Sequence, residues 1–324
     1  MSLVLTVDEA VWNGLVDRAL AVAGIDSVIP VVKGNGYGFG RAWLAAHSVK
    51  LGVTTIAVGT VHELPAATGL GADVVVLTPS LDGDLAGLPD DAVLTVGSTT
   101  QAAHLVEHGC TAPVVVKLQS SMRRHGFTPD ELGSAVVRAQ LDQLDVVAYA
   151  IHPPLAGDDA AHVAEIEHWL APLDGHRPAS IDVSHVSVES FAALRNRHPG
   201  RRFRLRLGTA MWHGDKSMLH LGADVLDVRP VARGTPAGYR ATPVPGDGHL
   251  VLIGAGTATG VTLLDGGLSP FHHARHRLTL LEAPHMHTSM AFVPAGDPLP
   301  DVGGVVDVQR PLTMVTPDRV VWVR

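Results

Sequence analysis

The sequence predicts an α/β protein, in which a (β/α)8 barrel of the TIM type is followed by a C-terminal all-β domain. Apolar strand-like segments alternate with helical segments up to about residue 207, and the composition changes after about residue 215. The length of 324 residues suits one large barrel with a smaller appended domain. We therefore expect a barrel over residues 8–215 and a β-domain over residues 216–324, which also takes in an N-terminal strand at residues 1–7.

The barrel is expected to use eight parallel strands. After a helix at residues 8–24, strands are predicted at residues 27–33, 54–59, 73–78, 92–96, 114–118, 145–151, 180–184 and 202–207. Helices are predicted at residues 41–51, 62–69, 99–108, 129–141, 159–170 and 188–195. Continuous apolar strands that alternate with helices are typical of a parallel sheet covered on both faces. A doubly wound sheet is the alternative, but no Gly-x-Gly-x-x-Gly turn opens the first unit.

The β-domain is predicted because Pro, Gly and Thr become frequent and long helical periodicity stops after about residue 215. The short strand candidates lie at residues 249–253, 261–264, 277–281, 290–293, 305–308 and 319–323.

Composition and charge exclude several classes of partner. The net charge is −8, so we expect no nucleic-acid partner. We interpret most of the basic run at residues 195–206 as the solvated entry to a strand. The single cysteine, Cys110, allows no intrachain disulfide. The first residues lack a basic segment and soon reach Asp8 and Glu9, and no apolar run approaches the ~20 residues that span a bilayer. We therefore expect a cytoplasmic protein without a membrane partner.

Lys33 is the first candidate functional residue. It ends the first barrel strand and opens a glycine-rich loop, Lys33-Gly-Asn-Gly-Tyr-Gly-Phe-Gly, at the barrel face where active sites lie. Burial lowers the pKa of a lysine and makes its amine nucleophilic toward an aldehyde. Glycines allow close approach of the backbone to a ligand, and the hydroxyl of Tyr37 is available to a phosphate. The alternative is a surface lysine ahead of a flexible loop.

Two segments resemble alanine racemases. VVKGNGYGFG resembles the lysine segment that binds pyridoxal 5'-phosphate (PLP) in that family, and residues 114–127 resemble the family segment around Met-x-Arg-x-Gly, matched here at 122–126. The resemblance implies that Lys33 carries PLP as a Schiff base. It also implies that Arg124 bonds the phenolic oxygen of PLP, and that Lys117, seven residues earlier, is carbamylated and steadies this arginine.

A third segment, RLGTAMW at residues 206–212, resembles the family's Arg-Pro-Gly-Ile-Ala-Leu-Tyr. The resemblance implies that Arg206 faces the pyridine nitrogen and that backbone amides after Gly208, including that of Thr209, hold the phosphate. An arginine does not give up its proton, so the pyridine nitrogen stays unprotonated and PLP is a weaker electron sink, which suits racemisation. The alternative is a charge in a basic strand.

A weaker match lies at Ser184 and His185, where the family has Asn-Ser with the serine on the phosphate. His152 falls where the family has a histidine stacked near the cofactor ring. For His185 the alternative is a loop histidine with no functional role.

The resemblance covers nearly the whole chain and implies a PLP-dependent amino-acid racemase or epimerase, an isomerase of amino-acid metabolism that acts on a small-molecule amino acid. It implies a homodimer, in which the β-domain of one subunit completes the site of the other. Lys33 is expected to serve as one of two catalytic bases.

The second base is missing from its usual place. The family carries it as a tyrosine, and Ala255 stands at the aligned position; the chain has only three tyrosines. His287 replaces a family aspartate near the substrate carboxylate, and residues 319–324 lack a family tyrosine that helps to hold the phosphate. His287 belongs to a cluster of β-domain histidines with His272, His273 and His285. We take His287 as the candidate second base, because histidine titrates near neutral pH; the alternative is that these are solvated loop histidines. No known zinc spacing is present, so we expect no metal.

Two alternatives stay open. The chain is then either a one-base PLP enzyme, such as a decarboxylase or lyase, or a PLP-binding protein of the same fold without catalysis.

Overall fold

The computed structural model describes residues 2–81, 85–176 and 180–324. The contacts within the chain group its residues into two compact units. One contains the residues up to Gly14, the segment Tyr37–Gly40 and Asp215–Arg324; the other contains Leu15–Gly36 and Arg41–Gly214. We describe each unit by itself and call them the β-domain and the barrel.

The barrel is an eight-stranded parallel sheet in the order β2-β9-β8-β7-β6-β5-β4-β3. The bridge between Val31 and Ala57 joins its first and last strands, so the predicted barrel is confirmed. The strands are β2 (Val28–Pro30), β3 (Thr55–Val58), β4 (Asp73–Val76), β5 (Ala92–Val96), β6 (Val114–Lys117), β7 (Val146–Ala150), β8 (Ser180–Val183) and β9 (Phe203–Leu207).

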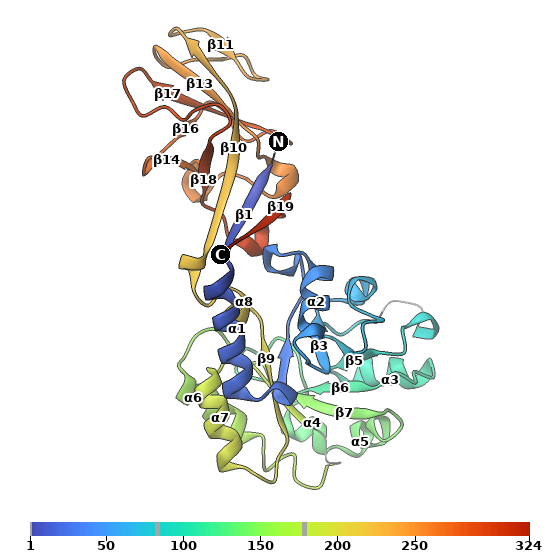
Figure 1. Cartoon of the computed structure of the whole chain (residues 1–324). Helices are drawn as coiled ribbons and strands as arrows, with labels where there is room; N and C mark the ends of the chain where they lie inside the picture. Colours follow the sequence, from blue (N-terminus) through green and yellow to red (C-terminus); the bar gives the residue numbers. More distant parts are fainter. Residues whose placement is uncertain (1, 82–84, 177–179) are drawn as a thin grey trace. The chain divides into compact units, whose positions relative to one another are not determined.

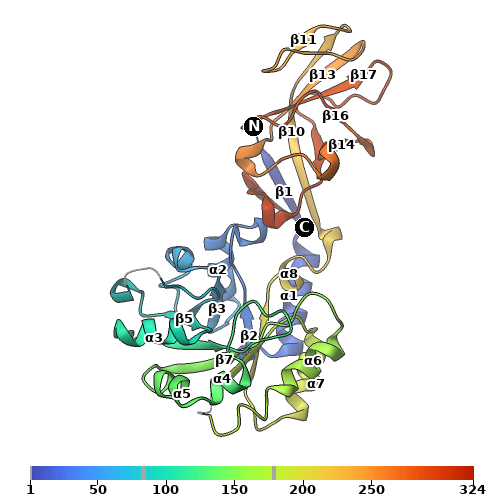
Figure 2. The same cartoon turned by 180° about the vertical axis from the view of Figure 1, so that it is seen from behind.

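Helices accompany the barrel strands, as Figures 1 and 2 show from opposite sides. They are α1 (Glu9–Ala23), α2 (Arg41–Lys50), α3 (Thr99–Glu107), α4 (Pro129–Gly133), α5 (Ala135–Leu141), α6 (Asp159–His168), α7 (Val188–Arg197) and α8 (Thr209–Trp212). Several begin at side chains that cap the first free amides: Ser98, Asp158 and Ser187 each accept a hydrogen bond from the backbone amide three residues on.

Two predicted barrel helices differ in the structure. Residues 62–69 were expected to be helical, but only the 3-10 segment η3 (Val61–Ala66) forms, and it contains Pro65, which lacks an amide hydrogen. The predicted helix at 129–141 is two helices. Ser134 has an extended backbone, ends α4 and caps α5 with its hydroxyl, so it breaks the run.

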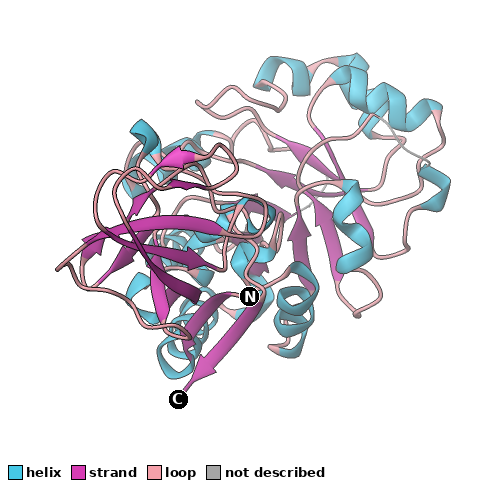
Figure 3. Cartoon of the chain, turned by 90° about the horizontal axis from the view of Figure 1, so that it is seen from above, coloured by secondary structure: helices cyan, strands magenta, loops and turns pink. Residues whose placement is uncertain are grey.

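The β-domain is built on a nine-stranded sheet, whose main path runs β15-β14-β18-β10-β13-β17-β16. The N-terminal strand β1 (Leu3–Asp8) joins it by antiparallel pairing with β10 and parallel pairing with β19. Strands are its main element, drawn in magenta in Figure 3. They are β10 (Leu219–Val231), β13 (Gly248–Ile253), β14 (Phe271–His273), β15 (His276–Arg277), β16 (Thr279–Leu280), β17 (Ser289–Pro294), β18 (Val305–Val308) and β19 (Arg319–Val323), with the separate pair β11 (Pro236–Ala237) and β12 (Thr242–Pro243).

The strands predicted from the sequence do not include the longest strand of this domain, β10, and they include one, at residues 261–264, that does not form. β10 escaped notice because its thirteen residues mix glycine, proline and acidic residues with the apolar ones. The expected strand at 261–264 is irregular, because it follows the tight turn at Gly260, which has a φ of +80°. The predicted strand at 277–281 is two short strands that pair with different partners, β14 and β17.

An aromatic cluster explains why the segment Tyr37–Gly40 groups with the β-domain. Trp12, Phe39 and Trp322 pack with ring centroids 5.1 to 5.9 Å apart. Among the described residues, no helix has the length and apolar character needed to cross a membrane.

Candidate active site

Five barrel strands carry the site residues that the sequence singled out. Because the strands are parallel, their carboxyl ends meet at one face, which we call the barrel mouth. The residues are Lys33 after β2, Lys117 at the end of β6, His152 after β7, Ser184 and His185 after β8, and Arg206 on β9, followed by Gly208 and Thr209.

Lys33 is solvent-exposed but lies in a crowded, cationic environment. Desolvation lowers the pKa of its ammonium, and the positive charges of Arg124 and Arg206 lower it further, whereas the carboxylate of Glu63 acts to raise it. A larger share of uncharged amine results, which is the form that attacks an aldehyde.

Arg206 is buried in the barrel. Its Nη2 donates hydrogen bonds to the carbonyl of Ile151 at 2.6 Å and to Oγ of Ser184 at 3.5 Å. Its Nε is buried and has no hydrogen-bond partner among the described residues. Burial lowers the pKa of Arg206 to about 10, and Asp182 opposes this shift, so the guanidinium stays charged at neutral pH. A buried donor without a partner indicates room for an acceptor that the polypeptide does not supply.

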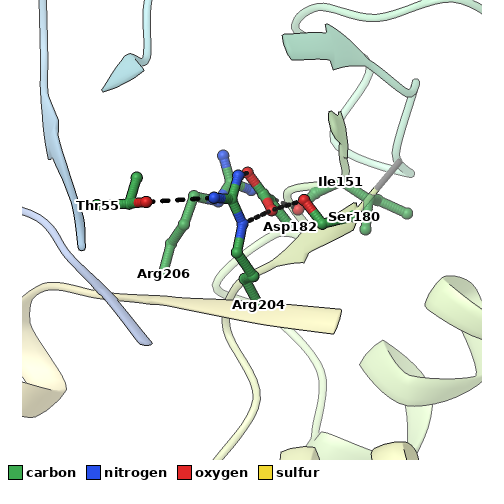
Figure 4. A network of polar contacts seen from close by, with 6 residues as sticks. All are labelled: Thr55, Ile151, Ser180, Asp182, Arg204 and Arg206. Carbon is green, nitrogen blue, oxygen red and sulfur yellow. Dashed lines mark hydrogen bonds and ion pairs between the residues drawn. The ribbon is translucent and has the colours of Figure 1, made fainter. Parts of the chain in front are cut away.

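Asp182 and Arg204 form an ion pair inside the barrel (Figure 4). Nε and Nη2 of Arg204 donate to the two carboxylate oxygens of Asp182 at 2.8 and 2.9 Å, and Nη1 donates to Oγ1 of Thr55 at 3.3 Å. Asp182 is fully buried. The interpretation of the basic run as a solvated strand entry is therefore wrong for Arg204 and Arg206, because alternate residues of β9 face the barrel interior.

Ser184 joins Arg206 to two histidines. Its Oγ lies 2.7 Å from Nδ1 of His152 and 3.3 Å from Nδ1 of His185. Because an arginine only donates, Ser184 accepts from Arg206 and its own hydrogen is left for a histidine nitrogen. Burial, followed by the charges of Arg206 and Lys117, lowers the pKa of His152 to about 2, so this ring is neutral. The His152 and His185 rings pack edge to face, with centroids 4.4 Å apart.

Lys117 lies almost completely buried beneath this group. Desolvation lowers its pKa well below the ordinary value, and Arg206 and Arg124 act in the same direction. A buried uncharged amine is the species that combines with dissolved carbon dioxide. Lys117 lines a small cavity together with Ser120, Met122, Arg124, His125 and His152.

The loop that carries Arg124 depends on Gly126. Its φ is +119°, and a Cβ at this position would lie 2.4 Å from the carbonyl carbon of Leu118. Leu118 and Phe127 form a parallel bridge that closes the base of the loop. The glycine of the Met-x-Arg-x-Gly pattern is therefore needed for the turn that returns the chain to the end of β6.

Gly208 connects β9 to the short helix α8, which starts at Thr209. The free amides of a first helical turn bind anions. Nε1 of Trp212, at the end of this helix, donates to the carbonyl of Val31 at 2.8 Å. This bond ties the turn after β9 to the strand that carries Lys33.

Comparisons with known proteins decide the family. The family model described as alanine racemase, N-terminal domain, matches residues 14–215, which is more than half of the chain. The chain belongs to the alanine racemase family. The alanine racemase of Mycolicibacterium vanbaalenii is 31% identical over 267 residues, which cover 74% of this chain and 67% of that protein. That of Beutenbergia cavernae is 30% identical over 292 residues, which cover 82% and 77%.

Solved structures of alanine racemases share the fold. The enzyme from Bartonella henselae, which contains covalently bound pyridoxal phosphate, matches with a TM-score of 0.74 and 17% identity over 100% of both chains. The enzyme from Clostridium difficile matches with a TM-score of 0.76 and 17% identity, covering 98% of this chain and 94% of that one.

Tyr37, the remaining barrel-loop candidate, lies in the 3-10 segment η2 (Gly36–Gly38) with a φ of 56°. It is buried, and burial raises the pKa of its phenol to about 12. The hydroxyl therefore keeps its hydrogen at neutral pH and can donate it. In the units defined above, Tyr37 groups with the β-domain, while Lys33 belongs to the barrel.

Ala255 and His287, the two residues predicted to depart from the racemase pattern, are both in the β-domain. Ala255 is buried, and its carbonyl accepts a hydrogen bond from Ser289 at 2.8 Å; His287 is exposed. The amides of Thr257 and Ala258 donate to the carbonyls of His285 and Met286, so the loop after Ala255 lies against the segment that leads to His287.

The segment that leads to His287 also contacts a tyrosine, Tyr239, for which the sequence suggested no role. Tyr239 is 87% exposed, and its ring contacts that of His285 at 4.4 Å between centroids. Glu282 anchors this arrangement, since it accepts Nε2–H of His285 at 2.5 Å and the amide of Tyr239 at 2.8 Å.

Four further barrel residues were also missed: Asp182 and Arg204 in the barrel interior, and Glu63 and Arg41 beside Gly34. The alternation Phe203-Arg-Leu-Arg-Leu on a strand expected to be covered on both faces could have shown that Arg204 points inward with Arg206. For Glu63 and Arg41 the sequence offered no pattern, because they bind backbone atoms of Gly34 and Gly59 and form an ion pair between separate segments of the chain.

Proposed function

We propose that the protein is a PLP-dependent amino-acid racemase in which Lys33 binds the cofactor and serves as one catalytic base. Membership of the alanine racemase family gives the cofactor and the isomerase class. The observation that carries the residue assignment is the position of Lys33 at the barrel mouth, with Arg124 and Arg206 lowering its pKa.

The residues of the barrel mouth fit PLP. Its phosphate and phenolic oxygen are anionic, and the mouth is cationic, with Lys33, Arg124 and Arg206 near one another. The buried Nε of Arg206 lacks an acceptor among the described residues, and a pyridine nitrogen is one. The amides after Gly208, with Tyr37, Ser184 and His185, are the proposed phosphate ligands.

PLP supplies a sink for the electron pair that the α-carbon of the substrate keeps when its proton leaves. The polypeptide moves the protons: Lys33 Nζ takes or gives the α-proton on one face. Arg206 stays protonated and so gives no proton to the pyridine nitrogen, which limits the lifetime of charge at the α-carbon and disfavours side reactions. His152, held neutral, is proposed to lie beside the ring. Lys117 is proposed to be carbamylated and to steady Arg124.

The second face needs its own proton donor. We propose His287 for this role, supplied by the β-domain of the partner subunit in a homodimer. The enzyme is proposed to act on an amino acid in the cytoplasm. Tyr239 is the competing candidate, because the Glu282–His285 pair holds its turn in place and leaves its ring exposed.

A specific observation favours a second function. Ala255 is buried and cannot transfer a proton, so an enzyme with Lys33 as its only base would act on one face and catalyse decarboxylation or elimination. Loss of turnover altogether would leave a PLP-binding protein of the same fold.

The test follows α-proton exchange in deuterium oxide with a panel of D- and L-amino acids. Racemisation predicts deuterated product of both configurations from either enantiomer. Retention of one configuration throughout contradicts a racemase and supports the one-base enzyme.

Lys33→Ala should lose the visible absorbance of lysine-bound PLP, and absence of that absorbance from the wild type would contradict the whole assignment. A loss of racemisation in His287→Asn but not in Tyr239→Phe supports His287, and the reverse result supports Tyr239.

A further inference from the structure

The peptide groups on both sides of Gly34, the residue after Lys33, are held by one ion pair. The amide of Gly34 donates to Oε1 of Glu63 at 3.0 Å, and Nη2 of Arg41 donates to the carbonyl of Gly34. Arg41 and Glu63 face each other at 3.4 Å between Nη2 and Oε1. Their side chains are only 26% and 15% exposed, so water screens this pair incompletely.

Glu63 also binds the neighbouring strand. Its Oε2 accepts the amide of Gly59, just past the end of β3, at 2.6 Å. Gly59 packs tightly here, since a Cβ added to it would lie 3.1 Å from Oε2 of Glu63 and 3.4 Å from Cβ of Lys33. One carboxylate therefore fastens the backbone after Lys33 to the adjacent barrel strand, and the ion pair to Arg41 completes the attachment.

Glu63 carries a negative charge, whereas the other ionisable groups that interact with Lys33 are basic. The ionisable groups that interact with Lys33 come from η3, β6 and its following loop, β8 and β9: Glu63, Lys117, Arg124, His185 and Arg206. Of these only Glu63 is acidic. Asp182, the buried carboxylate deeper in the barrel, acts instead to raise the pKa of Lys117 and of Arg206. Glu63 is thus the group in this set that favours positive charge on Lys33 Nζ.

We propose that Arg41 and Glu63 are positioning residues for Lys33: they fix the peptide that follows it, and the carboxylate of Glu63 maintains a proton on the nitrogen that links Lys33 to the cofactor. The inference rests on the proposed attachment of PLP to Lys33. It adds to that proposal a pair of residues that act through Lys33 and the peptide that follows it.

Substitutions can separate the hydrogen bonds that Glu63 and Arg41 make to Gly34, which we call the clamp, from the effect of the negative charge of Glu63 on Lys33. Glu63→Gln removes the charge and keeps one acceptor, whereas Glu63→Ala removes both. Glu131→Gln is the matched control, because Glu131 also accepts a backbone amide, that of Thr128 at 2.8 Å, but belongs to the capping box of α4. Arg41→Met keeps the carboxylate and loses the bond to the carbonyl of Gly34.

The first measurement is a pH titration of the absorbance of lysine-bound PLP. Loss of the carboxylate that acts to raise the pKa of Lys33 should lower the midpoint by about one pH unit in Glu63→Gln and in Glu63→Ala. Glu131→Gln should titrate like the wild type. An unchanged midpoint in both Glu63 variants would overturn the electrostatic role.

The second measurement is hydrogen exchange of the segment Lys33–Gly36 in cofactor-free protein, which does not depend on activity. Exchange should speed up at least about tenfold in Glu63→Ala and rise also in Arg41→Met, since each loses a bond to Gly34. Unchanged exchange in both would overturn the positioning role. Arg41→Met keeps the test decisive if the Glu63 variants do not fold.

The two measurements separate this inference from the proposed function. If the wild type attaches no PLP to Lys33, the proposed function and the electrostatic role fall together, while exchange still shows whether the clamp holds the loop. If the wild type attaches PLP and racemises an amino acid but the variants match it in both measurements, only this inference falls.

Discussion

Asp182 and Arg204 pair side by side across β8 and β9, with both carboxylate oxygens of Asp182 bonded to the guanidinium of Arg204. The pair lies in the barrel interior, and Arg206 follows two residues later on the same strand. Asp182 also counteracts the fall in the pKa of Arg206 that burial causes. One buried carboxylate therefore balances two buried guanidinium groups.

Replacement of Asp182 should strongly destabilise the barrel. Asp182→Asn leaves Arg204 and Arg206 without their buried counter-charge, and we expect the free energy of unfolding to fall by about 3 to 5 kcal/mol, measured by urea denaturation. The control is Asp174→Asn, whose exposed pair with Arg201 should contribute under about 1 kcal/mol. Equal effects of the two substitutions would contradict this account.

Gly126→Ala should displace the loop that carries Arg124. The positive φ and the approach to Leu118 are both unfavourable for a side chain, and the strain should cost about 1 to 3 kcal/mol of stability. The affinity for PLP should fall as well, as measured by fluorescence titration. Gly133→Ala is the control, because a Cβ at that position would meet no atom within 4 Å and alanine is favoured over glycine in a helix. A normal PLP affinity in Gly126→Ala would speak against a role for this loop.

The cofactor-free protein should lose stability in mild acid through His152. Its folded pKa is about 2, far below the unfolded value of about 6.5, so the unfolded chain binds a proton that the folded chain does not. This contribution is present above pH ~6.5 and is lost as the pH falls below it, by up to about 1.4 kcal/mol per pH unit. His152→Gln should flatten this dependence in urea denaturation between pH ~7 and ~5, and an unchanged slope would contradict this account.

Lys117 should take up carbon dioxide. Burial, followed by the charges of Arg206 and Arg124, lowers the pKa of its ammonium well below the ordinary value, which favours the uncharged amine, and the same positive groups stabilise the anionic carbamate that forms. Protein incubated with ¹³C-labelled bicarbonate should show a carbamate carbon resonance that is absent from Lys117→Met. Racemase turnover should fall on removal of bicarbonate in the wild type only. A wild-type spectrum that matches that of Lys117→Met would refute the carbamate.

Most of the fold could be predicted because periodicity survives in the sequence. The barrel strands are short, apolar and evenly separated by helices, and β5, β18 and β19 occur at the predicted bounds. Prediction failed where a single residue overrides a pattern. Pro65 limits a helix to a 3-10 turn, Ser134 divides another helix, and the mixed composition of β10 hides a strand that pairing with β1, β13 and β18 stabilises.

The sequence alone determined the chemistry that is available at the barrel mouth. Lys33, Arg124, Arg206 and the glycine turn at Gly208 lie at or after the ends of predicted barrel strands. Parallel strands bring their carboxyl ends to one face, so these residues were expected to meet. From its resemblance to alanine racemases, the sequence also predicts that Ala255 stands where that family has a tyrosine. Tertiary structure alone decided the charge balance. The pairing of Asp182 with Arg204, the neutral state of His152 and the hold of Glu63 on Gly34 all depend on burial and on contacts between distant segments. Such contacts leave no periodic trace, because each is one side chain meeting one partner across the fold.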